Sequence, residues 1–168
     1  MDKIRSNILL IGMPGAGKST IGRILSKRTG MPVVDTDDLL EEAENMKLQE
    51  ILRDKGLEYF GEAEARVLSG LMLKGYIIST GGSAVYYEEA MEQLRKCCVV
   101  VYLKASVERL LRNIKNIESR GIALKPGQTF EELYAERQPL YEKFADITIE
   151  TDGQTPASIC KEIRSQLL

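Results

Sequence analysis

Short apolar runs alternate along this chain with longer segments in which apolar residues recur every three or four positions. The run Asn7–Ile11 has no polar alternation, which is typical of a strand buried on both faces. The segment Lys18–Arg28 places Ile21, Ile24 and Leu25 on one side of a helix. The expected strands are Asn7–Ile11, Met31–Val34, Tyr76–Ser79, Cys97–Leu103 and Asp146–Glu150. The expected helices are Lys18–Arg28, Asp37–Glu44, Lys47–Asp54, Leu57–Leu73, Tyr86–Arg95, Ser106–Arg112, Glu131–Phe144 and Thr155–Leu168.

This alternation predicts an α/β fold with three layers, in which helices cover both faces of a parallel sheet. The length of 168 residues fits a single domain, and no shift in composition indicates a boundary within residues 1–168. Ligands of such sheets bind outside the carboxyl ends of the strands. Those ends are expected at Gly12, Asp35, Thr80 and Leu103.

One segment, Asn113–Gln128, departs from the alternation. It is polar, contains Gly121, Pro126 and Gly127, and follows no helical or strand period. A loop of this length inside a compact domain is unusual and often functional. We therefore expect this segment to take part in the site.

Composition excludes several classes of function. The net charge of −2 gives no electrostatic reason to bind nucleic acid or a membrane surface. The chain has no histidine, which excludes a Ser-His-Asp triad and histidine metal ligands. Its three cysteines, Cys97, Cys98 and Cys160, are interpreted as small core residues. Without a signal-like N-terminus or a long apolar run, a cytoplasmic enzyme is expected.

A glycine-rich segment joins the first expected strand to the first expected helix. Its residues, which we call the phosphate loop, are Gly12, Met13, Pro14, Gly15, Ala16, Gly17, Lys18, Ser19 and Thr20. The first eight match G-x-x-x-x-G-K-[ST], in which backbone N–H groups surround phosphates, the lysine reaches the β- and γ-phosphates and the hydroxyl binds Mg²⁺. The helix that starts there adds its positive dipole end. The pattern predicts an enzyme that uses ATP with Mg²⁺.

The class of phosphate-loop enzyme follows from what else the chain contains. No segment of the N-K-x-D type, which reads guanine in GTPases, occurs here. Motor and remodelling ATPases usually need a longer chain. A small-molecule kinase is the remaining prediction, and kinases of this size are often monomers.

Further motifs follow in chain order. They are Thr20 and Gly22, Asp35-Thr36-Asp37, Gly56 with Phe60 and Glu64, Ser79-Thr80-Gly81-Gly82, Val101-Tyr102-Leu103, Arg120, and Glu136-Arg137-Gln138-Pro139-Leu140-Tyr141. Together they resemble the shikimate kinase family along nearly the whole chain. The resemblance implies a P-loop kinase fold with substrate-binding helices at about 37–73, a lid at about 113–128, and phosphorylation of shikimate to shikimate 3-phosphate.

Two carboxylates beside the phosphate loop receive roles from this resemblance and from their position past a strand end. Asp35, with Ser19, is assigned to Mg²⁺. Asp37 is assigned to the acceptor and is the candidate base that takes the hydroxyl proton. An alternative is that Asp37 only caps the following helix.

The resemblance implies the remaining site residues. Phe60, Gly81 and Gly82 would bind the acceptor, although a plain turn is an alternative for the glycines. Arg137 would pair with the acceptor carboxylate. Arg120 would close over the phosphates as the lid arginine. Arg112 is a plausible partner for adenine, with a solvated surface position as the alternative.

The departures from the family pattern gather on the acceptor side. The family arginine that joins Arg137 in binding the shikimate carboxylate is Gly61 here, and the glutamate after Gly56 is Leu57. Ser83 replaces the third glycine of S-T-G-G-G, and the lid reads R-G-I-A where the family has R-P-L-L. Loss of one charge-assisted partner typically costs about 1.5–3 kcal/mol. The motifs on the nucleotide side are intact. A changed acceptor would produce departures on the acceptor side alone.

Three alternatives therefore accompany shikimate. A hydroxy amino acid such as homoserine would place its carboxylate on Arg137 and its ammonium near Glu62 or Asp37. A nucleotide-binding module without catalysis is a second alternative, although the retained Lys18 and Asp37 argue against it. An ATPase that acts on a protein partner is the third.

Overall fold

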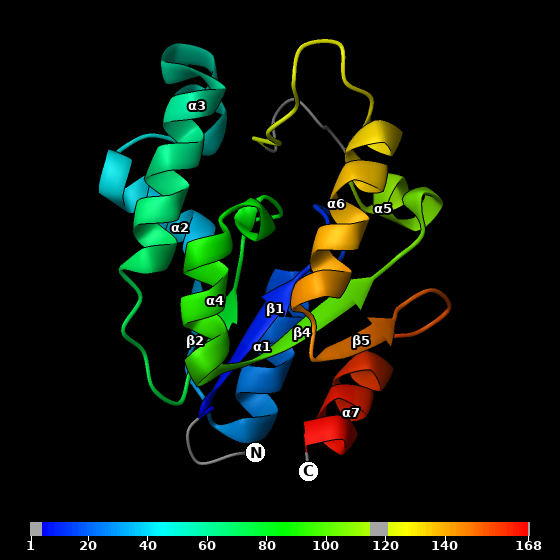
Figure 1. The fold of residues 1–168 in the computed structure, drawn as a ribbon. Coiled ribbons are helices and arrows are strands. Elements are labelled where there is room, and N and C mark those ends of the chain that lie inside the picture. The colour runs from blue at the N-terminus through cyan, green and yellow to red at the C-terminus, as the bar shows by residue number, and fades with distance from the viewer. Residues whose placement is uncertain (1–4, 115–120, 168) are drawn as a thin grey trace.

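The structure, a computed structural model, describes residues 5–114 and 121–167. Within them, five parallel strands form one sheet in the order β2-β3-β1-β4-β5 (Figure 1). The strands are β1 Asn7–Ile11, β2 Val33–Asp35, β3 Ile77–Ser79, β4 Cys98–Lys104 and β5 Ile147–Glu150. The predicted parallel α/β sheet is confirmed.

The centre of the sheet is its most apolar part. Strand β1 lies between β3 and β4, with Leu9 opposite Ile78 on one side and Val100 on the other. Every residue of β1 is buried, because helices cover both of its faces. The edge strands β2 and β5 are partly exposed.

Helices connect the strands and form the two outer layers. They are α1 Lys18–Thr29, α2 Thr36–Glu44, α3 Leu48–Ser69, the 3₁₀ turn η1 Ala84–Tyr86, α4 Glu88–Cys97, α5 Val107–Asn113, α6 Phe130–Phe144 and α7 Pro156–Leu167. Helices α1 and α7 pack together, whereas α4 and α6 lie over the sheet on its other side (Figure 1). None of the helices in the described ranges is long and apolar enough to cross a membrane.

Helix α3 consists of two helical parts separated by a kink, as predicted. It is interrupted at Gly56 by non-helical backbone with φ 87° and ψ 171°. Its second part ends at Ser69, four residues before the predicted end at Leu73, and Gly75 then turns the chain with φ 78°. The predicted helix Tyr86–Arg95 is instead the turn η1 followed by α4.

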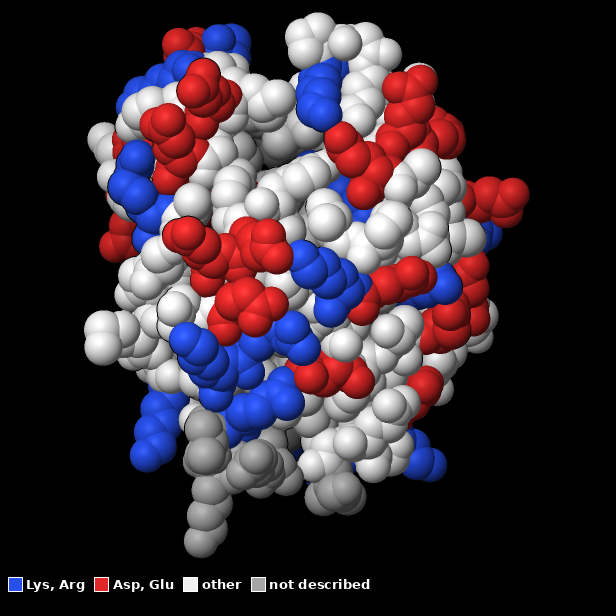
Figure 2. Space-filling view, viewed as in Figure 1, with Lys and Arg blue, Asp and Glu red and all other residues white. Residues whose placement is uncertain are grey.

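Helices α2 and α3 have a small apolar cluster of their own. Leu40, Ile51, Phe60 and Ala63 are buried there, apart from the main core of the sheet. The two helices therefore pack on each other beside the sheet, and a hollow separates them from the chain that leads into α6 (Figure 2). The cysteines belong to the core as predicted, with Cys98 and Cys160 buried and Cys97 half-buried.

Candidate active site

The phosphate loop joins β1 to α1 through backbone that only glycine adopts readily. Gly15 and Gly17 have φ of 86° and 90°, a region in which a side chain would be strained. Lys18 is buried, and its Nζ donates to the carbonyl oxygens of Gly12 at 2.6 Å and Met13 at 2.8 Å. The N-terminus of α1 thus opens, with its lysine, into a cavity of about 530 Å³.

Most predicted site residues line this one cavity. They are Pro14, Gly15, Ala16, Gly17, Lys18, Ser19, Thr20, Asp37, Phe60, Gly81, Gly82 and Arg137. Gly12 and Met13, the first two residues of the phosphate loop, do not line the cavity: Gly12 abuts the Leu103 carbonyl, and Met13 is buried. Arg120 lies outside the described residues, so its predicted role stays a prediction.

Ser19 and Asp35 meet beside the phosphate loop. The Ser19 hydroxyl donates to Asp35 Oδ2 at 2.7 Å. Asp35 Oδ1 accepts from the Asp37 backbone N–H at 2.9 Å and so caps α2. The alternative that Asp37 is the cap is therefore wrong, because Asp35 holds that position and Asp37 lies in the first turn.

The residues at this point suit Mg²⁺. No cluster of three or more acidic or cysteine side chains in the described ranges could hold a metal alone. Mg²⁺ binds in kinases through one or two protein oxygens together with phosphate oxygens and water, so Ser19 and Asp35 provide a fitting donor set.

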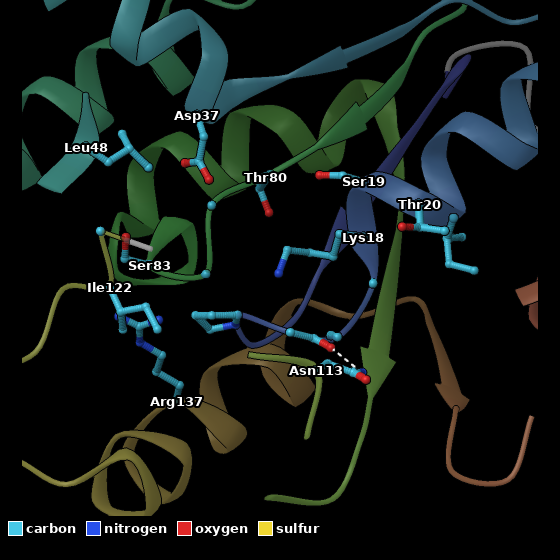
Figure 3. A pocket seen from close by; sticks show the side chains of 18 of the residues that line it. Lys18, Ser19, Thr20, Asp37, Leu48, Thr80, Ser83, Asn113, Ile122 and Arg137 are labelled. Carbon is cyan, nitrogen blue, oxygen red and sulfur yellow. Dashed lines mark hydrogen bonds between the residues drawn. The ribbon is translucent and has the colours of Figure 1, made fainter. Parts of the chain in front are cut away.

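Asp37 faces the cavity from the side opposite the phosphate loop (Figure 3). Its pKa is raised from 3.8 to about 7, chiefly by burial and also by the neighbouring charges of Asp35 and Glu64, whereas the charge of Lys18 acts in the opposite direction. A Cβ added at Gly81 would lie only 2.5 Å from Asp37 Oδ1, so Gly81 brings its backbone close to this carboxyl group. A base with a pKa near neutrality suits proton abstraction from a hydroxyl.

Glu64 is a cavity residue to which sequence reasoning assigned no role. It is 4% exposed, and its Oε1 accepts from the Ser83 hydroxyl at 2.5 Å. The Tyr87 hydroxyl also hydrogen-bonds to Glu64, whose pKa is raised by burial. Glu64 lies four residues after Phe60 on α3, so helical spacing was the signal that could have placed both on the cavity face.

Arg137 reaches the cavity from α6, across from Asp37 (Figure 3). It is 1% exposed, its Nε donates to the Tyr86 hydroxyl at 3.3 Å, and its guanidinium lies 5.3 Å from the Tyr86 ring centroid. Among the described residues no carboxylate lies within ion-pair distance of it. The charge of Glu64 interacts with Arg137, but a buried cation without an ion-pair partner is still costly, so the site is suited to receive an anion.

The space beside Gly61 is occupied by another side chain. A Cβ added at Gly61 would lie 3.1 Å from the Tyr87 hydroxyl oxygen. Tyr87 thus fills the region into which a longer side chain at this position would extend. The neighbouring Glu62 is exposed and does not line the cavity.

The far end of the cavity lies between α5 and the start of α7. Arg109, Asn113, Pro156 and Ile159 line it, whereas Arg112 is exposed and does not. The Arg109 guanidinium donates to the carbonyls of Thr151 and Gln154, and the Asn113 amide donates to the Gly15 carbonyl at 2.9 Å (Figure 3). The role predicted for Arg112 at adenine stays a prediction, and Arg109 is the arginine that lines the cavity.

Comparisons with known proteins agree with this geometry. The family profile described as "Shikimate kinase" matches residues 14–168. The shikimate kinase of Sulfurihydrogenibium sp. (strain YO3AOP1) is 36% identical over 162 residues, which are 96% of this chain and 97% of that protein.

Solved structures give the same result for the fold. The shikimate kinase from Acinetobacter baumannii in complex with shikimate has a TM-score of 0.89 at 31% identity, covering 96% of this chain and 92% of that one. The shikimate kinase from Aquifex aeolicus vf5 has a TM-score of 0.81 at 31% identity, covering 96% of this chain and 95% of that one. The predicted P-loop kinase fold and the kinase class are confirmed, and this chain belongs to the shikimate kinase family.

Proposed function

We propose that this chain transfers the γ-phosphoryl group of ATP to a hydroxyl group of shikimate, giving shikimate 3-phosphate. Membership in the shikimate kinase family supports ATP-dependent phosphorylation of shikimate. The observation that carries the acceptor is Arg137, a buried guanidinium without an ion-pair partner in the described ranges, across the cavity from Asp37. Shikimate has a carboxylate that Arg137 can bind and hydroxyl groups that can approach Asp37.

The nucleotide lies along the phosphate loop in this proposal. Backbone N–H groups of the loop and the start of α1 hold the β- and γ-phosphates, and Lys18 exchanges its two carbonyl partners for phosphate oxygens. Ser19 and Asp35 hold Mg²⁺, which neutralises charge on the phosphates when bound. Arg120 is proposed to add a further positive charge at the transferred group.

The acceptor lies between α3 and α6. Arg137 orients its carboxylate, Phe60 packs against its ring, and the backbone at Gly81 and Gly82 approaches its hydroxyl groups. Asp37 takes the hydroxyl proton as the oxygen attacks the γ-phosphorus, and ADP leaves.

A zwitterionic acceptor such as homoserine has less support. Of the two carboxylates suggested for its ammonium, Glu62 is exposed and lies outside the cavity lining, whereas Asp37 lines the cavity but is assigned to the acceptor hydroxyl. Glu64 does line the cavity, but Ser83 and Tyr87 already hydrogen-bond to it.

The test is ADP release with ATP and Mg²⁺ in the presence of shikimate, homoserine or no acceptor. Saturable release with shikimate above the background without acceptor supports the proposal. Equal release in all three reactions would indicate an ATPase, and release with homoserine alone would indicate the zwitterion.

Arg137→Lys is expected to raise the KM for shikimate by about ten- to a hundredfold, because lysine keeps the charge but loses the planar fork. The KM for ATP should stay within about twofold, since in this proposal the phosphates are held by the loop backbone and Lys18 rather than by Arg137. Steady-state kinetics with each substrate varied measure both. Arg66→Lys is the matched control, because Arg66 is an exposed α3 arginine that pairs with Glu44. An unchanged KM for shikimate in Arg137→Lys would contradict the role.

Gly61→Arg alone should not improve shikimate binding, because Tyr87 occupies the space that the new side chain needs. Gly61→Arg combined with Tyr87→Ser is expected to lower the KM for shikimate by about tenfold, since a second guanidinium then reaches the carboxylate. Tyr87→Ser alone is the control. A double variant no better than that control would show that position 61 does not reach the carboxylate.

A cytoplasmic location and a monomeric state are also proposed. The size and the family membership support both. Gel filtration tests the second: elution as a dimer would contradict it.

A further inference from the structure

Two hydrogen bonds lead away from the cavity behind Arg137. Arg137 Nε donates to the Tyr86 hydroxyl at 3.3 Å, and that hydroxyl donates to Glu136 Oε2 at 2.7 Å. Tyr86 comes from η1, whereas Glu136 and Arg137 are neighbours on α6. The three side chains join the two elements that flank the acceptor end of the cavity.

Glu136 also contacts the segment Gly121–Gln128. Lys125 Nζ donates to Glu136 Oε1 at 2.8 Å, and Gln128 Nε2 donates to Oε2 at 3.2 Å. These hydrogen bonds, with that of Tyr86, lower the pKa of Glu136 from 4.5 to about 2, so the group is a carboxylate at neutral pH. The Glu136 carboxylate thus accepts hydrogen bonds both from Tyr86 of η1 and from the segment Gly121–Gln128.

The same segment meets Arg137 directly. An Arg137 guanidinium nitrogen (Nη2) donates to the Ala123 carbonyl at 3.5 Å, and Gly121, Ile122 and Ala123 line the cavity beside it (Figure 3). Arg137 and the segment Gly121–Gln128 are therefore both tied to Glu136, one through Tyr86 and the other through Lys125 and Gln128.

The direction of the hydrogen bonds explains why a carboxylate is needed. Glu136 can only accept, so Tyr86 must donate to it, and the Tyr86 oxygen keeps its lone pairs for Arg137. Donation to a carboxylate makes the tyrosine oxygen a better acceptor. Tyr86 satisfies one N–H of the buried guanidinium without neutralising its charge, which leaves that charge for a ligand.

We infer that Glu136 and Tyr86 are positioning residues, which hold the Arg137 guanidinium in the orientation that receives the acceptor carboxylate and hold the segment Gly121–Gln128 beside it. This inference rests on the proposed function for the identity of the acceptor. The arrangement couples the carboxylate site to the chain that covers it, because the same anion orders both.

Tyr86→Phe is the first test, because it keeps the ring beneath Arg137 and removes only the hydroxyl. The Kd and the KM for shikimate are expected to rise by about five- to tenfold, with kcat and the KM for ATP within about twofold of the wild type. Glu136→Ala should raise these values at least as much, because it also removes the acceptor of Lys125 and Gln128. The double variant should be no worse than Glu136→Ala alone, since Tyr86 acts through Glu136. Calorimetry with shikimate and steady-state kinetics measure these values.

Lys143→Ala is the matched control. Lys143, on α6, forms an exposed ion pair with Glu88 at 2.6 Å, and the variant breaks it. Neither residue lines the cavity. The variant should leave the Kd for shikimate unchanged. A Tyr86→Phe Kd within about twofold of the wild type, a parallel rise in the KM for ATP, or fully additive effects in the double variant would each overturn the inference.

A second measurement needs no acceptor. Amide hydrogen exchange without ligand should become faster at Leu124 and Gln128 in Glu136→Ala, because their N–H groups bond only within the segment that Glu136 holds. Exchange there should be unchanged in Lys143→Ala. If the wild type neither binds nor phosphorylates shikimate, the proposed function fails, but the exchange measurement still decides whether Glu136 holds the segment Gly121–Gln128. Unchanged exchange in Glu136→Ala would overturn this role of Glu136.

Discussion

Asp37→Asn is expected to lower kcat for shikimate phosphorylation by about 10²- to 10⁴-fold, because asparagine keeps the shape of the side chain but cannot take the hydroxyl proton. Asp37 faces the acceptor end of the cavity, so the KM for ATP should change little. Asp38→Asn is the matched control, since Asp38 is exposed and does not line the cavity. A kcat near that of the wild type would exclude Asp37 as the base.

The pH dependence tests the same role. Because the pKa of Asp37 is about 7, kcat/KM for shikimate should rise with pH until about neutrality and then level off. The rising limb should be absent from the residual activity of Asp37→Asn. If it persists near the same pH, another group is responsible, and Glu64, whose pKa burial also raises, is the first candidate.

Stability gives a measurement independent of catalysis. A carboxyl group whose pKa is raised from 3.8 to about 7 on folding favours the folded state in its protonated form. That contribution is present below the unfolded pKa and is lost as the pH rises through the folded pKa. Asp37→Asn should therefore increase the free energy of unfolding by on the order of 2 kcal/mol near pH 8 and have little effect near pH 4. Urea unfolding at the two pH values measures the difference, and equal effects at both would contradict the burial of an ionisable group.

Lys18→Met is expected to lower kcat/KM for ATP by about 10²- to 10³-fold, because methionine has a similar length and no charge to place on the phosphates. The wild-type lysine is already inside the cavity, held by the Gly12 and Met13 carbonyls. Both kinetics and direct nucleotide binding should show the loss.

Lys27→Met is the matched control for this variant. Lys27 lies on the same helix, is exposed and does not line the cavity. It should leave nucleotide binding and turnover unchanged. If Lys18→Met also keeps ATP affinity and turnover, the phosphate loop does not bind the triphosphate and the proposed function fails.

Local chemistry accounts for what could be predicted from the sequence. The phosphate loop was identifiable because its glycines, lysine and serine are adjacent in the chain and their spacing reflects a single turn. The strand β1 was predicted with its correct bounds, because an unbroken apolar run can be satisfied only in the middle of a covered sheet. Helix ends were less accurate, as at Ser69, because they depend on how the next segment packs.

Tertiary structure decided which side chains meet. Arg109 and Arg112 lie three residues apart on α5. Arg109 is the one of the two that lines the cavity, with its guanidinium hydrogen-bonded to the Thr151 and Gln154 carbonyls between β5 and α7. Likewise, the sequence suggested Asp37 as a possible helix cap, and only the start of α2 makes Asp35 the cap.

The sequence by itself predicted the parallel sheet and the phosphate loop, and its resemblance to the family indicated the departure from the family arginine at Gly61. Only the tertiary structure placed Tyr87 in the space beside Gly61 and joined Tyr86 to Arg137 and Glu136. The physical reason is the distance in sequence over which the interactions act. Backbone conformation and apolar periodicity are set by neighbours in the chain, whereas the direction of a side chain across a cavity is set by elements tens of residues away.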